Sequence, residues 1–267
     1  MDIYQILISL VGGFFAGILN TFAGFGSVIT LAIYMDLMGL PGHIANATNR
    51  VNILASSSIS TATFIKNGKL DISKSKWIIL TVIAGAILGI ILATQLTDTG
   101  FKTAFNYLLI PILILLLINP SRFIEVDTTA KSASKWVLVP LLFVFGFYAG
   151  FIQVGFGILF LIIMVMLARH DLIHSNAIKT CIIASYTIIA VAIFHFQGLI
   201  DWKTGLFLTC GQAIGGYVAA LNASRLEGAN KLAYYILIFI LVAVIIKNFR
   251  ICFFFIAMPE TAGARPR

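Results

Sequence analysis

Long uninterrupted apolar runs dominate this chain, and they limit its possible folds more than any other feature. Crossing a bilayer takes roughly 20 apolar residues in a helix. Only 10% of the 267 residues are charged, whereas a soluble domain carries roughly a quarter, so a water-soluble fold is excluded. The sequence predicts a polytopic α-helical membrane protein with eight apolar segments, at roughly 3–38, 44–65, 77–96, 101–118, 137–167, 176–197, 203–221 and 232–256.

The net charge of +8 points to membrane topology and not to a nucleic-acid partner, because the positive residues lie mostly in short loops between apolar runs. The loop Lys66–Lys76 carries four lysines against one aspartate and is predicted to be cytoplasmic, while the orientation of the other loops stays open. The first apolar run has no basic region before it and no cleavage site, so we expect it to be retained rather than removed as a signal peptide.

Two halves of the chain resemble one another. Five pairs of short motifs recur in the same order, at a slowly drifting offset close to half the length of the chain: Gly13–Gly17 with Gly146–Gly150, Gly24–Gly26 with Gly155–Gly157, Asn46–Ala47 with Asn176–Ala177, Gly68–Asp71 with Gly198–Asp201, and Lys102–Phe105 with Lys231–Tyr234. We therefore predict a first transmembrane repeat over 1–118, a polar connector over 119–136, a second repeat over 137–256 and a disordered tail over 257–267. Transporters are often built from such repeats, with the substrate between them.

The first segment of each repeat is predicted to be broken or re-entrant. A helix over 3–38 would measure about 54 Å, far beyond the roughly 30 Å hydrocarbon core. The natural break is Asn20–Ser27, where two glycines disfavour a continuous helix and polar side chains can satisfy the freed backbone groups. Gln153–Gly157 is the matching break in the second half. Whether the repeats are parallel or inverted, and how many crossings they make, stays open at this point.

One cation in each half is predicted to lie inside the membrane. Arg50 follows Ala45–Asn49 and lies about 9 Å inside a helix that is expected to begin near His43. Lys179 lies in the corresponding stretch of the second half. An ionisable residue at this depth indicates a functional site, and we predict one anion site divided between the two cations and their Asn and Thr neighbours. The alternative is that Arg50 extends to the membrane surface or pairs with Asp36.

The two glycine-rich breaks are the second candidate feature. If short helices begin at Ser27 and Ile158 inside the membrane, their free backbone N–H groups favour an anion. The alternative is that the glycines of these breaks only allow close helix packing.

The motif Gly-x-x-Ala-Gly, followed by Asn-Thr-x-Ala-Gly-x-Gly-Ser and by Ala-Asn-Ala-Thr-Asn-Arg-Val, resembles the TauE/SafE family of sulfite exporters and organosulfonate transporters. The resemblance covers nearly the whole chain; Phe25 replaces a glycine that many members carry. It implies a multi-pass protein of a prokaryotic cytoplasmic membrane that transports a small sulfur-containing oxyanion or organosulfonate, with no cofactor and no metal. The expected substrate-binding residues are those of the two motif copies: Asn20, Thr21, Gly24, Gly26, Ser27, Asn46, Thr48, Asn49, Arg50, Gln153, Gly155, Gly157, Asn176 and Lys179.

The leading hypothesis is a secondary carrier that binds its anion near the midplane between the repeats. An anion channel and an accessory subunit that transports nothing remain alternatives. An intramembrane enzyme or redox relay is disfavoured, because the three cysteines lie far apart and no catalytic serine motif surrounds Ser56–Ser58, which we interpret as polar helix packing. The exact substrate, the direction of transport, the coupling ion and homodimerisation stay open.

Overall fold

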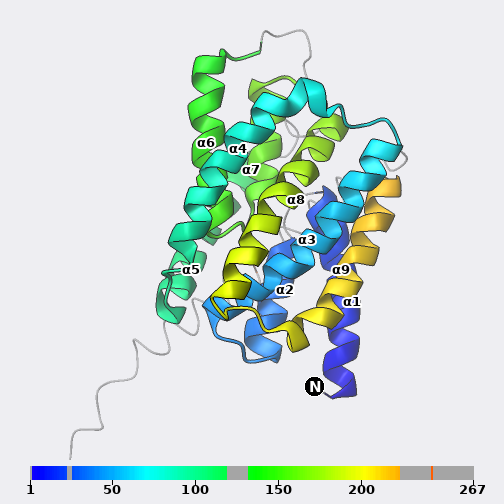
Figure 1. Ribbon diagram of the computed structural model, residues 1–267, viewed down its shortest axis with the longest axis vertical. Helices are drawn as coiled ribbons and strands as arrows, with labels where there is room; N and C mark the ends of the chain where they lie inside the picture. The colour runs from blue at the N-terminus through cyan, green and yellow to red at the C-terminus, as the bar shows by residue number, and fades with distance from the viewer. Residues whose placement is uncertain (1, 23–25, 119–131, 223–241, 243–267) are drawn as a thin grey trace, which may run out of the picture.

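The computed structural model describes residues 2–22, 26–118, 132–222 and 242, and these residues contain helices and no strand. Gly24, residues 119–131 of the connector, most of the segment at 232–256 and the tail at 257–267 lie outside the described residues. Figure 1 shows the helices in chain order: α1 Ile3–Phe22, α2 Gly26–Ala32, α3 Gly42–Lys66, α4 Ile72–Ala93, α5 Asp98–Ile118, α6 Lys135–Phe151, α7 Phe156–Ile162, α8 Leu172–Phe196 and α9 Trp202–Asn222.

Four of these helices, α1, α4, α8 and α9, are long and apolar enough to cross a membrane, judged by length and composition. Short π-helical turns, Ile33–Leu37 and Ile163–Leu167, continue α2 and α7. The helix bounds agree with the predicted apolar segments within a few residues, since the length of each apolar run determines how much helix the membrane core can bury.

Helices α3 and α8 have the same length and the same kind of end. Each has 25 residues, and the spacing from the start of α3 to the start of α8 equals that from the start of α4 to the start of α9. Both α3 and α8 end in a turn with a glycine at positive φ, Gly68 at 65° and Gly198 at 69°. The residue after each glycine donates its N–H to a carbonyl five residues back, which satisfies one of the last helical acceptors.

Small residues hold α1 against α9 and α4 against α6. A Cβ added to Gly17 would lie 2.2 Å from the Gln212 carbonyl oxygen, and one added to Gly150 would lie 2.0 Å from that of Ala86. Backbones approach this closely in membrane proteins where glycines recur four residues apart. Such pairs occur in all four helices: Gly13 and Gly17, Gly211 and Gly215, Gly85 and Gly89, and Gly146 and Gly150.

The same contacts give the directions of the helices. Successive glycines of α1 approach successively later residues of α9, so these helices run parallel, and α4 and α6 are parallel by the same criterion. Helix α3 also runs parallel to α9, since Thr48 contacts Asp201 and Ser60 contacts Gly216. The short turn between α3 and α4 reverses the chain. Helices α1 and α6 therefore run in opposite directions.

The helices of the two halves are interleaved. Figure 1 shows α1 beside α9 on one side of the molecule and α4 beside α6 on the other, with α3 and α8 packed together between them. The first helix of each half thus packs against the helix of the third apolar segment in the other half. The largest buried apolar cluster lies around α4, α6, α7 and α8, and a second one surrounds α2 and the start of α3.

Candidate functional site

Arg50 binds the end of helix α6. Its guanidinium is completely buried and donates to the carbonyl oxygens of Ala149 at 3.0 Å, Gly150 at 2.8 Å and Phe151 at 3.5 Å. It also donates to the side-chain oxygen of Gln153. The last carbonyls of a helix have no intrahelical partner, and a cation stabilises the negative end of the helix dipole. Arg50 therefore closes the C-terminus of α6 and does not extend to the surface.

The chain between α6 and α7 is bent by two residues at positive φ, Gln153 at 69° and Gly155 at 75°. A glutamine in this region of φ is uncommon and is held there by its surroundings. The Gln153 side chain is bonded to Arg50, and the Tyr148 hydroxyl donates to the Val154 carbonyl. The Arg50 side chain lies beside the Tyr186 hydroxyl and 6.0 Å from the centre of the Phe194 ring, both on α8.

Lys179 makes the corresponding contacts in the other half. Its ammonium is completely buried on α8 and donates to the carbonyl oxygens of Thr21 at 2.8 Å and Asn20 at 3.4 Å, at the end of α1. It also donates to Asn176 Oδ1 at 2.7 Å. All three N–H groups of the ammonium are thereby engaged. Each cation thus closes the first helix of the opposite half.

The two cations occupy separate places. Helices α3 and α8 are antiparallel, because the start of α3 at Arg50 meets Phe194 and its end at Phe64 meets Ala177. Lys179 lies 15 residues before Phe194 on α8, so the helical rise separates the two cations by roughly 20 Å along the helix axes. A single small oxyanion spans only a few ångströms and does not contact both at this separation.

No carboxylate that the structure describes is buried beside these two charges. The aspartates in that part of the chain are exposed or half-buried, and the salt bridges of Asp71, Asp98 and Asp171 involve exposed side chains. Asp36, the alternative partner of Arg50, is an exposed residue. Burial of a cation in a medium of low dielectric is costly without compensation, and helix carbonyls compensate it only in part.

Most of the other predicted residues are buried around these two places. On α3, Thr48 accepts from the Asp201 N–H at 3.0 Å, and Asn49 accepts from the Thr30 hydroxyl of α2 at 2.6 Å. Thr21 is 3.2 Å from the Ser60 hydroxyl, which joins α1 to α3. Asn46, Ser27 and Gly157 are buried in their helices.

Gly26 bears on the packing alternative for the glycine-rich breaks. A Cβ at this position would lie 2.1 Å from the Ala16 carbonyl oxygen, so α2 begins directly against α1. In the second break, Gly155 instead supplies a positive φ just before α7. Gly26 therefore allows α1 and α2 to pack closely, whereas Gly155 allows the chain to turn before α7.

The sequence interpretation named Thr48 and the polar packing at Ser56 but missed the row of polar side chains between α3 and α9 to which they belong, which we call the polar seam. Asn52 Oδ1 accepts from Tyr34 at 2.8 Å and from Thr209 at 2.7 Å, and Gln212 Nε2 donates to Ser56 Oγ at 3.3 Å. The seam consists of Thr48, Asn52, Ser56 and Ser60 of α3 with Thr209 and Gln212 of α9. The spacing of four residues on α3 was a signal in the sequence, because residues four apart share a helix face.

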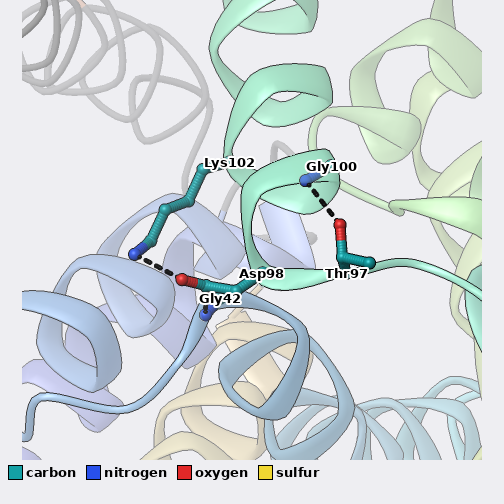
Figure 2. A network of polar contacts seen from close by, with 5 residues as sticks. All are labelled: Gly42, Thr97, Asp98, Gly100 and Lys102. Atoms are coloured by element: carbon teal, nitrogen blue, oxygen red, sulfur yellow. Dashed lines mark hydrogen bonds and ion pairs between the residues drawn. The ribbon is translucent and has the colours of Figure 1, made fainter.

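A second polar network fixes the start of α3 (Figure 2). The Asp98 carboxylate accepts from the Gly42 N–H, at the first residue of α3, and from Lys102 Nζ at 2.9 Å. Thr97 caps α5 by accepting from the Gly100 N–H at 3.1 Å. Lys102, followed by the Gly42 amide, holds the pKa of the Asp98 carboxyl below its usual value. Asp98 thereby ties α5 to the helix that carries Arg50.

Long apolar helices, a buried polar seam and buried cations at the ends of interrupted helices define a multi-pass helical membrane protein, the class to which secondary transporters belong. More particularly, the chain belongs to the sulfite exporter TauE/SafE family, whose sequence profile matches residues 9–247. It is also 28% identical over 237 residues to a probable membrane transporter protein, ORF9, from a Sinorhizobium species, and the match covers 89% of each chain. No solved structure gave a significant match.

Proposed function

We propose that this protein is a secondary carrier of a small sulfur-containing oxyanion or organosulfonate in a prokaryotic cytoplasmic membrane. The observation that carries the proposal is the pair of buried cations, Arg50 and Lys179, without a buried carboxylate among the described residues. A protein interior with uncompensated positive charge attracts anions and repels cations. The family and the relative named as a probable membrane transporter support transport as the activity.

In this proposal the protein consists of two inverted repeats. Three observations support it: α1 and α6 run in opposite directions, α3 and α8 have the same length and the same spacing to the helix that follows, and each cation closes the first helix of the opposite half. Interrupted helices between inverted repeats are the usual site of substrates in secondary transporters. The Asn and Thr side chains of the interior then supply neutral contacts, while Arg50 and Lys179 supply positive charge without both touching the anion.

The membrane potential makes export of the anion favourable without a coupled ion. An inside-negative potential of 100 mV is worth about 2.3 kcal/mol per elementary charge, which corresponds to roughly a fiftyfold outward gradient. A carrier with net positive interior charge and one anionic substrate therefore needs no sodium or proton site for export.

Transport by purified protein in proteoliposomes tests the proposal. We expect uptake of labelled sulfite or sulfoacetate to saturate with concentration and to show counterflow, in which unlabelled substrate inside drives labelled substrate in. A channel gives flux without counterflow, and an accessory subunit gives no flux above protein-free vesicles. Either of these two results would overturn the carrier.

A further inference from the structure

The interfaces α3–α9 and α8–α4 occupy corresponding places in the two halves but differ in chemistry. The polar seam lies in the first of them. In the second, the residues that correspond to the seam members are apolar except for one tyrosine: Ile178, Ile182, Tyr186 and Ala190 on α8, and Ile79 and Val82 on α4. Packing alone does not require polar side chains here, because the α8–α4 interface is held by hydrocarbon. The seam therefore has another use.

Two atoms of the seam are buried without a hydrogen-bond partner in the part of the chain that the structure describes. They are Asn52 Nδ2 and Gln212 Oε1, on side chains with no exposed surface. The orientation of Gln212 follows from Ser56, whose hydroxyl donates to the Ile53 carbonyl at 3.2 Å and can only accept from Gln212 Nε2. Leaving such a group unpaired costs about 1–3 kcal/mol, so each of these atoms needs a partner that the described residues do not supply.

The chemistry of the partner follows from what is missing. A free amide N–H needs an acceptor, and a free amide oxygen needs a donor. Asn52 and Ser56 are one helical turn apart on α3 and Gln212 binds Ser56, so the two side chains are neighbours in the seam. A metal cation does not suit the seam, because it would add to the uncompensated charge of Arg50 and Lys179. An oxyanion alone satisfies the free amide N–H but leaves the Gln212 oxygen without a donor, which a hydroxyl group on the same ligand supplies.

We propose that the polar seam holds the hydrogen-bonding part of the substrate site, centred on Asn52 and Gln212, and that it takes a small oxyanion bearing a hydroxyl group. Asn52 donates to an oxygen of the anion, and Gln212 accepts from the hydroxyl. The Lys179 N–H groups and both terminal nitrogens of the Arg50 guanidinium are already engaged, which leaves Arg50 Nε as the unpaired charged donor among the two cations. Neutral groups therefore supply most of the direct contacts. This inference rests on the proposed carrier function.

Two sulfonates that differ only in a hydroxyl group test the proposal on the wild-type protein. Isethionate, 2-hydroxyethanesulfonate, should compete with labelled substrate in proteoliposomes at least about tenfold better than ethanesulfonate, since a site built for a hydroxyl strongly rejects an analogue without it. Equal competition by the two overturns the seam proposal and leaves the carrier function intact. If neither sulfonate competes and sulfite flux does not saturate, both the seam proposal and the carrier function are overturned.

Substitutions then show which side chains cause the preference for isethionate over ethanesulfonate. Gln212→Leu and Asn52→Leu should each reduce the ratio of isethionate to ethanesulfonate affinity towards one, while Ile182→Leu, at the position of α8 that corresponds to Asn52, should leave the ratio unchanged. Folding of each variant is checked by gel filtration and thermal unfolding in detergent. A Gln212→Leu protein that keeps the full ratio overturns the assignment. If that variant does not fold, Gln212→Asn is used instead, because it shortens the side chain but keeps the amide. It should lower the ratio of isethionate to ethanesulfonate affinity, and an unchanged ratio overturns the assignment of Gln212.

Discussion

The guanidinium of Arg50 and the side-chain oxygen of Gln153 are hydrogen-bonded although 103 positions separate them in the chain. One residue belongs to a continuous helix of the first half and the other to the break in the second half. The bond joins a buried cation to a residue at positive φ, where glutamine is uncommon. The charge of Arg50 and the shape of the break between α6 and α7 therefore depend on each other.

Removal of the guanidinium should destabilise the protein. Arg50→Ala leaves the carbonyls of Ala149 and Gly150 buried without a partner, so we expect the free energy of unfolding to fall by at least about 2 kcal/mol. Thermal unfolding in detergent measures the change. Lys102→Ala is the control, since its exposed ion pair is worth under about 1 kcal/mol. Equal midpoints for the two variants would contradict the capping role of Arg50.

Substitutions at Gln153 should separate backbone shape from hydrogen bonding. Gln153→Gly accepts the positive φ but loses the bond to Arg50, while Gln153→Val loses both, so stability should decrease in the order wild type, glycine, valine. When Arg50 is already replaced by alanine, Gln153→Gly should lower the free energy of unfolding by less than it does in the wild type. The difference, which is the coupling energy between the two residues, should be about 0.5–3 kcal/mol. Additive effects in this double-mutant cycle would show that the bond contributes nothing.

Close backbone packing should make the interface glycines sensitive to one methyl group. Gly150→Ala places Cβ 2.0 Å from the Ala86 carbonyl oxygen, and α4 and α6 must separate to admit it. We expect a loss of about 1–3 kcal/mol, as for other overpacked sites. Gly12→Ala is the matched control, because its Cβ meets the end of the Ile33 side chain, which can rotate away. Thermal midpoints that drop equally would mean that the helices are not held by this contact.

Acid should weaken the link between α3 and α5. The lowered pKa of Asp98 means that its carboxylate stabilises the folded state at pH values above the unfolded pKa of about 4, and that this contribution is lost as the pH falls through the lower folded pKa. The effect is below about 1 kcal/mol, since the side chain is 39% exposed. In thermal unfolding, Asp98→Asn should be less stable than wild type near neutral pH and equal to it in acid. A constant difference across this range would exclude the carboxylate as the cause.

The N-terminus should face away from the cytoplasm. With the helix directions given above, Lys66, Lys69, Lys74, Lys135 and Arg169 lie at one end of the bundle, and α1 begins at the opposite end. Cytoplasmic loops carry the excess of positive charge. In a protein without its native cysteines, a membrane-impermeant maleimide should label Asp2→Cys in intact cells and Lys69→Cys only after lysis. The reverse pattern would invert the topology.

The helices were predictable from sequence and the partners of the cations were not. The ends of an apolar run such as 44–65 predict the ends of a helix, since the length of the run must match the membrane core. Helix α3 follows that run closely. The depth of Arg50 was readable in the same way. Its partners are backbone carbonyls in the other half of the chain. Every residue has a backbone carbonyl, so the sequence does not show which ones Arg50 contacts. The sequence therefore located the two buried cations but not the helix ends that they contact.

The glycine motifs show a similar limit. Gly13–Gly17 and Gly146–Gly150 were recognised as related, but nothing in either motif names the helix that it contacts. The structure pairs them with α9 and α4, each a helix of the opposite half of the chain. The polar seam was readable in part, as a period of four residues from Thr48 to Ser60, and its contrast with α8 becomes visible once the two helices are aligned.

The packing of α1 against α9 has a consequence for biosynthesis. Helix α1 leaves the ribosome first, but the surface formed by Gly13 and Gly17 finds its partner only after residues 202–222 have been translated. Until then the nascent chain holds an unmatched glycine surface among lipids or against the insertion machinery. Final assembly is therefore a late event, and a chain truncated before α9 leaves the glycine surface of its first helix without its partner.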